Sequence, residues 1–243
     1  MSAEFSIIIP TLDEAAGIGR TLDALQCFRE HAEIIIADGG SSDETVSIAE
    51  SRGAKVIAAP RGRGIQLHAG ACAATGSVLW FLHADSIPPP DALRKIGLAL
   101  EDDESVGGNF VLQFDGDSRA ARFMTWFYDK IRHIGLLYGD SGIFVRRDVY
   151  QRIGGFKPLP SFDDLDFIGR LKMEGILVRL QGKLVTSSRR FEGRPFVPVF
   201  LRWVLYQCLY WLGVSPFWLA KAYYPVRQEK DSTVSAPDAN NSR

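Results

Sequence analysis

Four short apolar runs, each followed by a helical or loop segment, constrain the fold of this chain more than any other feature. The runs are Phe5–Ile9, Ile34–Ala37, Lys55–Ala59 and Val78–Leu82. Runs of this length, rich in β-branched and aromatic residues, are typical of buried strands. Strands that alternate with helices form a parallel, doubly wound sheet with right-handed crossovers. The sequence therefore predicts an α/β protein with a Rossmann-like N-terminal half.

A carboxylate follows three of these four runs. Asp13, Asp38 and Asp85 stand in the segments after the first, second and fourth run. Loops at the carboxyl ends of parallel strands converge on one crevice, which is where ligands bind in open α/β sheets. Carboxylates alone would repel a phosphate, and a divalent metal between them and a pyrophosphate removes this conflict. We therefore expect a crevice that binds a diphosphate together with Mn²⁺ or Mg²⁺.

The second half of the chain departs from the alternating pattern. Val106–Phe114 alternates in the manner of a half-exposed strand, and short strands are expected at Gly142–Arg146 and Ile176–Leu180. The sheet should therefore become mixed. A helix is expected over Ser118–Ile134, and another begins at Asp163. The first of these helices packs on the core with a solvated basic face, or presents that face to an acceptor or a membrane.

The segment Phe196–Tyr224 is unusually aromatic. Its charge-free stretch, Trp203–Ala220, is interrupted by Gly213 and Pro216, whereas a membrane-spanning helix needs about 20 apolar residues in succession. Two helices joined at Gly213–Pro216 are therefore predicted. Tryptophan and tyrosine with basic flanks are typical of a segment that lies on a membrane surface. Burial in the core, or in a homodimer interface with a second copy of the chain, fits the same pattern.

These patterns divide the chain into residues 1–194, an α/β domain, residues 195–228, the aromatic helices, and residues 229–243, a polar tail predicted to be disordered. The net charge of −1 argues against a nucleic acid partner. The three cysteines stand far apart, and no basic and apolar leader precedes the first strand. We expect a cytoplasmic protein, peripheral on the inner face of the plasma membrane if the aromatic helices bind lipid.

The motifs, taken in order, resemble the family 2 glycosyltransferases of the GT-A fold over about Phe5–Phe191. SIIIPTLDEA, from Ser6, resembles their first strand and nucleotide-contacting loop, and IIIADGGSSDET, from Ile34, resembles their second strand. The resemblance implies that residues 1–194 are a GT-A domain with a mixed sheet, which transfers a sugar from a nucleoside diphosphate donor to an acceptor with inversion. It implies a set of donor-binding residues: Pro10, Asp13, Asp38, Arg61, Arg63, Gln66, Ala84, Asp163, Arg189 and Arg190.

LHAD, from Leu82, occupies the place of the family's D-x-D metal motif. The second carboxylate of that motif is present as Asp85, and its first position is His83. The resemblance therefore implies a metal held by Asp85 and His83. Imidazole suits Mn²⁺ better than Mg²⁺, and a contact to another ligand of the metal, or no metal role, is the alternative for His83.

FDDLDFIGRLKMEG, from Phe162, resembles the family's ED-x-D segment, which carries the catalytic base. On this resemblance Asp164 is the base that takes the proton from the acceptor hydroxyl, and Asp163 stands in the Glu position. Surface acids that cap a helix would give the same pattern. SSRRF, from Ser187, takes the place of Q-x-x-R-W, whose arginine binds diphosphate, although the Gln is missing and Phe191 replaces Trp.

Within the family, the HAD variant, the R-G-R-G-x-Q loop and the LGVSP tail resemble a small bacterial group associated with radical-SAM, selenodomain or arsenosugar clusters. The acceptor stays open, and a lipid-linked acceptor suits the aromatic tail. Because the D-x-D and Q-x-x-R-W positions are altered, a catalytically silent GT-A-like protein that binds a nucleotide or sugar is the alternative function. A haloacid dehalogenase phosphatase is disfavoured, since His83 stands where its nucleophilic Asp is needed.

Overall fold

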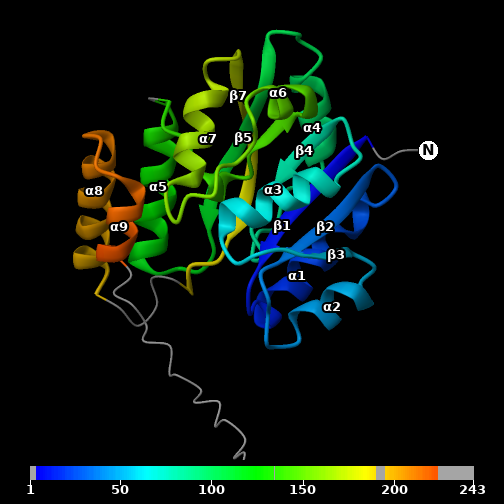
Figure 1. The fold of residues 1–243 in the computed structure, drawn as a ribbon, viewed down its shortest axis with the longest axis horizontal. Coiled ribbons are helices and arrows are strands. Elements are labelled where there is room, and N and C mark those ends of the chain that lie inside the picture. The colour runs from blue at the N-terminus through cyan, green and yellow to red at the C-terminus, as the bar shows by residue number, and fades with distance from the viewer. Residues whose placement is uncertain (1–3, 134, 190–194, 224–243) are drawn as a thin grey trace, which may run out of the picture.

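A computed structural model describes residues 4–133, 135–189 and 195–223 (Figure 1). Within this part of the chain, seven strands form one sheet in the order β3-β2-β1-β4-β6-β5-β7. The strands are β1 (Phe5–Thr11), β2 (Ala32–Asp38), β3 (Lys55–Ala58), β4 (Val78–Phe81), β5 (Ser105–Phe114), β6 (Phe144–Arg146) and β7 (Ile176–Thr186). The helices are α1 (Ala15–Leu25), α2 (Thr45–Ser51), α3 (Arg63–Ala73), α4 (Ala92–Ala99), α5 (Arg119–His133), α6 (Arg147–Arg152), α7 (Asp163–Leu171), α8 (Phe196–Trp211) and α9 (Pro216–Tyr223).

The first four strands are parallel, as predicted. β1 pairs with β2 on one side and with β4 on the other, and β2 pairs with β3. The helices α1, α2 and α3 lie between these strands in sequence. Because these strands are parallel, their carboxyl ends lie at the same end of the sheet. The loops that follow β1, β2 and β4 therefore meet there.

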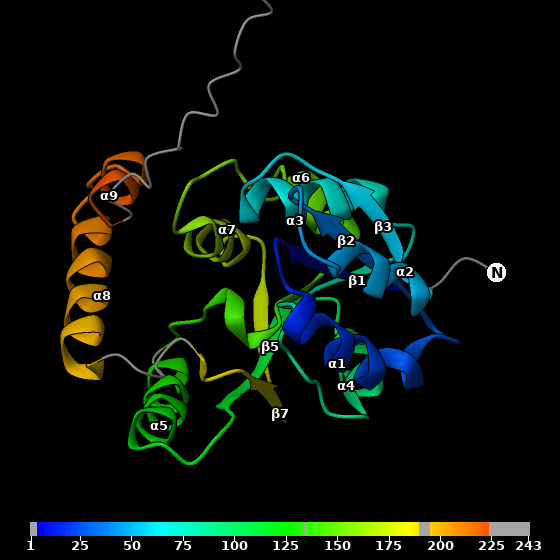
Figure 2. The ribbon, with the colours of Figure 1, turned by 90° about the horizontal axis from the view of Figure 1, so that it is seen from below.

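Helices cover both faces of the sheet (Figure 2). Successive residues of a strand point to opposite faces, so Ile7 and Ile9 enter the core beneath α1 and α4, while Ile8 enters the core beneath α3, α6 and α7. The three isoleucines are fully buried. The uninterrupted apolar run that marked this strand in the sequence is therefore explained by burial on both sides.

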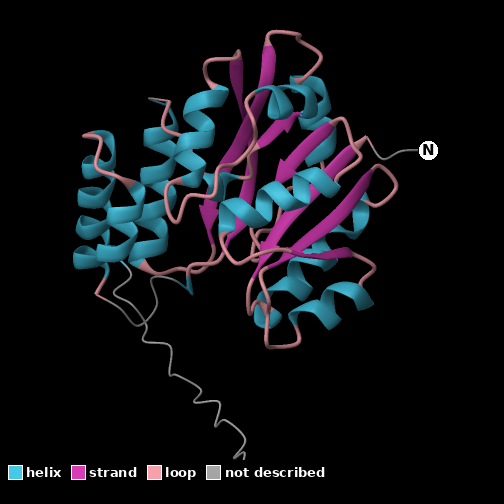
Figure 3. Ribbon diagram, in the orientation of Figure 1, coloured by secondary structure: helices cyan, strands magenta, loops and turns pink. Residues whose placement is uncertain are grey.

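The second half of the sheet is mixed, which confirms that prediction (Figure 3). β6 is antiparallel to both β4 and β5, and β7 is parallel to β5. β7 is longer than the predicted strand Ile176–Leu180, because a register irregularity between Asn109 and Val111 lets its pairing with β5 continue to Thr186. The extension brings Thr186 to the end of the sheet where β4 stops.

The two predicted C-terminal helices are present as α8 and α9, separated at Gly213, whose φ is 88°. One face of α8 packs on α5 through aromatic side chains, with Phe200 against Phe123 at 5.4 Å and against Phe127 at 5.2 Å between ring centroids. α5 thus has the predicted core-packed side. Among the described residues, no helix is long and apolar enough to cross a membrane. Arg190, Tyr224 and the predicted tail 229–243 lie outside the described residues.

Candidate active site

Asp38, the last residue of β2, organises the loop that follows it. The side chain is only 6% exposed and accepts hydrogen bonds from the Thr11 hydroxyl at 2.9 Å and from the backbone amides of Gly40 and Ser41 at 3.0 and 2.8 Å. The Ser41 hydroxyl donates a fourth bond. Burial acts to raise the pKa of Asp38, but the hydrogen bonds from Ser41, Thr11 and Gly40 lower it below the ordinary value. Asp38 is therefore a carboxylate at neutral pH that holds this loop in place.

Asp13 links the loop after β1 to the loop after β2. Its carboxylate accepts hydrogen bonds from the Ser42 amide at 2.7 Å and the Ser42 hydroxyl at 3.1 Å, and its own amide donates to the Ser41 hydroxyl at 2.9 Å. Its φ of 54° lies in the left-handed region, which Asp tolerates better than most residues. The two loops therefore form one hydrogen-bonded unit at the exits of adjacent strands.

Gln66, on α3, connects the carboxyl ends of β1 and β2 through hydrogen bonds. Its amide nitrogen donates to the backbone oxygens of Thr11 at 2.7 Å and Ala37 at 2.8 Å, and the side chain is buried. A Cβ on Gly39 would lie 3.0 Å from this amide, which explains the glycine there. Pro10 is half-buried within β1, opposite Ala37. Arg61 is exposed in the loop before α3.

Asp85 stands just beyond β4 in a cluster that is open to solvent. Its carboxylate accepts a hydrogen bond from the Thr186 hydroxyl at 3.2 Å and lies 3.5 Å from the Arg189 guanidinium. Arg189 also pairs with Glu14 at 3.3 Å. Burial lowers the pKa of Arg189, and Glu14 and Asp85 raise it, with a net increase, so the side chain is a cation. We call Glu14, Asp85, Thr186 and Arg189 the Arg189 cluster.

The backbone next to Asp85 is held in place through the Ala84 carbonyl. It accepts a hydrogen bond from the buried Thr21 hydroxyl at 2.7 Å, which ties the β4 exit to α1. Gly17, in the first turn of α1, brings that helix close: a Cβ there would lie 3.8 Å from the Asp85 Cβ and 3.5 Å from the Arg189 guanidinium. The Ala84 side chain itself is buried, so this residue acts through its backbone.

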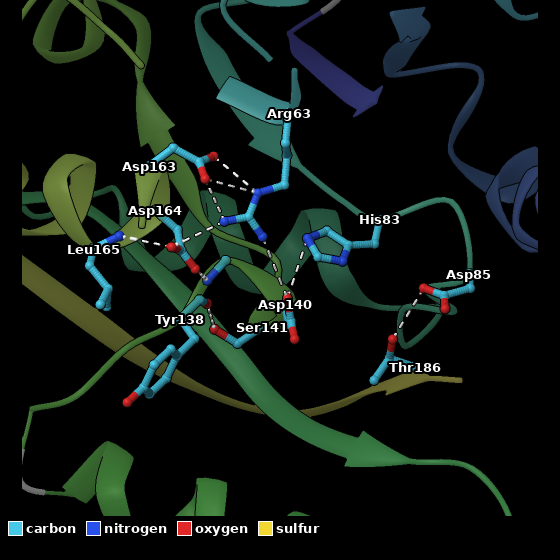
Figure 4. A network of polar contacts seen from close by, with 11 residues as sticks. Arg63, His83, Asp85, Tyr138, Asp140, Ser141, Asp163, Asp164, Leu165 and Thr186 are labelled. Atoms are coloured by element: carbon cyan, nitrogen blue, oxygen red, sulfur yellow. Dashed lines mark hydrogen bonds and ion pairs between the residues drawn. The ribbon is translucent and has the colours of Figure 1, made fainter. Parts of the chain in front are cut away.

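A second cluster surrounds Arg63 (Figure 4). The Arg63 guanidinium lies 2.7 Å from Asp163, 3.1 Å from Asp164 and 4.0 Å from Asp140, and His83 lies 3.5 Å from Asp140. Burial opposes the charge of Arg63, but Asp164 and Asp163 raise its pKa well above the usual range. We call these five residues the Arg63 cluster. Arg63 therefore faces carboxylates of α7 and of the turn before β6.

Gly64 allows α3 to approach α7 at this point. A Cβ on Gly64 would lie 2.6 Å from the Lys157 carbonyl oxygen and 3.2 Å from the Asp163 Cβ. Both distances are shorter than ordinary contacts between carbon and its neighbours. The glycine and the arginine before it thus join the third crossover helix to the segment that begins α7.

Asp163 and Asp164 differ in accessibility. The Asp163 side chain is 3% exposed, and the Asp164 side chain is 12% exposed. Asp164 accepts hydrogen bonds from the Gly139 amide at 2.9 Å and from the Leu165 amide at 3.0 Å. It also lines a cavity of about 10 Å³, room for about one water molecule, together with His83 and Gly139. Neither residue is one of the surface acids that the helix-capping alternative required.

The structure brings the sequence-predicted residues together in three groups. Asp13, Asp38 and Gln66 shape the first two loops, Asp85 and Arg189 meet in one cluster, and Arg63, His83, Asp163 and Asp164 meet in the other. His83 and Asp85 contact different partners. Glu14, Asp140 and Thr186 also belong to these groups, and they were not predicted from the sequence. Asp140 lies in the run Gly139-Asp140-Ser141-Gly142, where an acid in a short segment between two glycines is the local signal that was available.

The side chains at Asp85 suit one mode of metal binding. Among the described residues, no group of three His, Cys, Asp or Glu side chains is arranged to hold a metal ion. Mg²⁺ in phosphate sites is usually bound by one or two carboxylates together with the phosphates of the substrate. Asp85, whose side chain is 27% exposed, matches this mode. The predicted pairing of His83 with Asp85 does not form a site of its own, because His83 faces Asp140.

Comparison with known proteins places the chain among glycosyltransferases. The model of the family described as glycosyl transferase family 2 matches residues 6–153. A PGL/p-HBAD biosynthesis glycosyltransferase of Mycobacterium tuberculosis is 35% identical over 208 residues, which cover 78% of this chain and 78% of that protein. These matches support the family and give no support to the narrower radical-SAM and selenodomain grouping.

Solved structures of similar fold agree. Glucosyl-3-phosphoglycerate synthase from Mycobacterium tuberculosis, in complex with Mn²⁺, UDP and glucosyl-3-phosphoglycerate, superposes with a TM-score of 0.62 at 20% identity, over 87% of this chain and 81% of that one. S. aureus TarS 1-349 in complex with UDP-GlcNAc gives a TM-score of 0.62 at 17% identity, over 81% of this chain, which spans 61% of the TarS chain. The mixed sheet is therefore a GT-A fold, and the chain belongs to glycosyl transferase family 2.

Proposed function

We propose that the chain transfers a sugar, with inversion, from a nucleoside diphosphate donor to an acceptor hydroxyl, and that Asp164 is the general base. One observation carries the assignment of the base. Asp164 lines the cavity that also touches His83 at the exit of β4, whereas Asp163 is almost fully enclosed by its contacts with Arg63. The family match ends at residue 153, so this role rests on the geometry of α7.

In this proposal the acceptor oxygen attacks the anomeric carbon while the bond from that carbon to the diphosphate breaks. The acceptor proton goes to Asp164, and the electron pair of the broken bond leaves with the nucleoside diphosphate. Attack from the face opposite the leaving group inverts the anomeric centre. The Gly139 amide and Arg63 fix the Asp164 carboxylate, since each binds one of its oxygens. A fixed base is effective because its orientation is set before the acceptor arrives.

The leaving diphosphate would be held by the Arg189 cluster. Arg189 is half exposed and lies beside Asp85, so a phosphate has access to a cation that is already oriented. Asp85 would hold a divalent cation, which would neutralise charge on the diphosphate. The mycobacterial synthase complex, which contains Mn²⁺ and UDP, supports this choice of ligands. The loops fixed by Asp13 and Asp38 would form the nucleoside side of the crevice.

The test compares Asp164→Asn with Asp163→Asn, two neutral isosteres at adjacent positions. Release of nucleoside diphosphate from UDP-glucose and GDP-mannose is measured with a total lipid extract as the source of acceptor. Calorimetry with UDP and Mn²⁺ reports donor binding. Asp164→Asn should lose about 10²-fold or more in turnover, because a base acts in the transition state. UDP affinity should change by less than about threefold, since the base does not hold the donor.

Equal turnover in the two folded variants would mean that the base lies elsewhere, and Asp140→Asn would then be the next variant. A catalytically silent nucleotide-binding protein remains the second candidate, supported by the contact of His83 with Asp140 in place of Asp85. That alternative requires UDP or GDP binding with no release of nucleoside diphosphate from any donor in the wild type. Absence of binding to both nucleotides would contradict the two proposals together.

A further inference from the structure

The helices α8 and α9 lie at one side of the molecule, beside α5 (Figure 2), and several of their large apolar side chains are exposed. Val197, Leu201 and Leu205 follow one another at intervals of four residues, so they lie on one side of α8. Their exposed fractions are 62%, 60% and 56%. We call the exposed apolar residues of the two helices the outer face: Val197, Leu201, Leu205, Trp211, Leu212, Phe217 and Trp218. A group of large exposed apolar side chains on neighbouring helices is typical of an interaction site.

The charges within residues 195–223 have one sign. Residues 195–223 contain Arg202 and Lys221 and no Asp or Glu, although the whole chain has a net charge of −1. The adjacent helix α5 exposes Arg119, Arg122 and Lys130 on one helical face around the exposed Trp126, and its one acid, Asp129, pairs with Lys130 at 3.6 Å. Basic residues beside tryptophan and leucine are the composition of helices that lie at the surface of anionic bilayers.

We propose that the outer face of α8 and α9 docks on a membrane that contains anionic lipids. The apolar side chains enter the interface, and Arg202, Lys221 and the basic face of α5 contact the lipid headgroups. A second copy of the chain suits this surface less well. Two copies that met through α8 and α9 would bring together two segments that contain basic residues and no Asp or Glu.

The opposite side of α8 connects the docking surface to the Arg63 cluster. Trp203 packs on Tyr138 at 5.5 Å, and Tyr138 precedes the Gly139 amide that binds Asp164. Tyr210 stacks on Phe162 at 4.7 Å, just before Asp163. A helix that touches the membrane on one side therefore borders the proposed base on the other. The inference that the acceptor is lipid-borne rests on the proposed function, whereas the docking does not.

Vesicle flotation tests the docking with the full-length protein. The vesicles contain phosphatidylcholine alone, or phosphatidylcholine with phosphatidylglycerol. The first variant, Leu212→Ser with Trp218→Ser, removes apolar area from the outer face, and the second, Arg202→Gln with Lys221→Gln, removes charge. Leu98→Ser is the matched control, because Leu98 is an exposed leucine of α4, on another side of the molecule. Circular dichroism checks that each variant is folded.

The wild type and Leu98→Ser should float with the phosphatidylglycerol vesicles and bind phosphatidylcholine more weakly. The apolar variant should lose at least about tenfold in partitioning, since binding scales with the apolar area buried. The charge variant should lose about fivefold for each charge removed, and only on the anionic vesicles. Equal flotation of the apolar variant and the wild type would overturn the proposal.

Two further results separate the possible failures. A wild type that does not float, but forms a dimer in analytical ultracentrifugation that the apolar variant abolishes, would assign the outer face to a second copy of the chain. UDP binding, measured by calorimetry on the same samples, should be unchanged in all variants. Intact UDP binding without flotation refutes only the docking, and flotation without binding of any nucleotide refutes only the proposed function.

Discussion

Each of the two arginine clusters at the end of the sheet pairs a guanidinium with carboxylates, and the two clusters differ in their exposure to water. Arg63 pairs with Asp163 and Asp164, whose side chains are 3% and 12% exposed, while Arg189 is 50% exposed and pairs with Glu14 and Asp85 at 34% and 27%. Water screens the Arg189 pairs, so they contribute little to stability and exchange readily for another anion. The Arg63 pairs are costly to break, because carboxylates would be left buried without a cation. The Arg189 cluster is therefore suited to binding an anion, and the Arg63 cluster to stabilising the fold.

The largest expected effect comes from Arg63→Gln. It should lower the free energy of unfolding by roughly 3 kcal/mol, near the low end for buried ion pairs because about a third of the Arg63 side chain reaches solvent. Arg61→Gln, at an exposed position in the loop just before α3, should change it by less than about 0.5 kcal/mol. Urea denaturation of both variants measures the difference. Equal stability of the two would show that the Arg63 cluster does not hold the fold.

Asp85→Asn should leave folding intact and remove the metal-dependent part of UDP binding. The amide keeps the shape of the side chain and deletes the charge that balances a cation. We expect UDP affinity in the presence of Mn²⁺ to fall about tenfold or more, or about 1.4 kcal/mol, with little change in its absence. Calorimetry with and without Mn²⁺ checks this. An unchanged Mn²⁺ dependence would remove Asp85 from the proposed metal site.

Arg189→Gln should separate binding from stability. The free energy of unfolding should change by less than about 1 kcal/mol, because the pairs with Glu14 and Asp85 are exposed to water. UDP affinity should fall by roughly threefold to tenfold, and the loss should shrink as salt is added. Arg94→Gln, which removes another exposed pair on α4, is the control. A loss of stability as large as that of Arg63→Gln would erase the contrast between the clusters.

The smallest effect concerns acid stability at Asp38. The pKa of Asp38 is lower in the folded protein than in the unfolded chain, so its contribution to stability is complete above the unfolded value, about 4, and is lost as the pH falls through the lower folded value. Asp38→Asn should therefore weaken the decline in stability on acidification. The measurement is the urea midpoint at neutral pH and at about pH 3. An identical decline in wild type and variant would contradict this assignment.

The sequence predicted the features that depend on local pattern. The strands around Ile7, Ile35 and Leu79 were evident because each lies in an unbroken apolar run. The mixed second half of the sheet was predicted because strands and helices no longer alternate there. The contacts of Arg63 were not predictable in this way. Its partner Asp163 is 100 residues away, and their meeting depends on how α3 packs against α7. The donor-binding role expected for Arg63 stays a prediction. In the structure, the Arg63 guanidinium pairs with the carboxylates of Asp163 and Asp164.

The same limit applies to the end of β7 and to Asp85. Thr186 reaches Asp85 only because the pairing of β5 with β7 tolerates an irregularity near Val111, which has no clear signature in the sequence. The roles of Asp164 as base and of Asp85 as metal ligand likewise stay predictions. Motif order suggested both positions, but accessibility, which distinguishes Asp164 from Asp163, is a property of the folded chain.

The missing Cβ of Gly64 has a mechanical consequence. At this residue the N-terminal half of the chain touches the second half, at the Lys157 carbonyl and Asp163, at a distance too short for one additional carbon atom. A hinge between the two halves would have to pull this contact apart together with the adjacent ion pairs of Arg63. Rigid-body opening between the two halves is therefore costly, and movement of the loops at the strand ends would disturb fewer of these contacts.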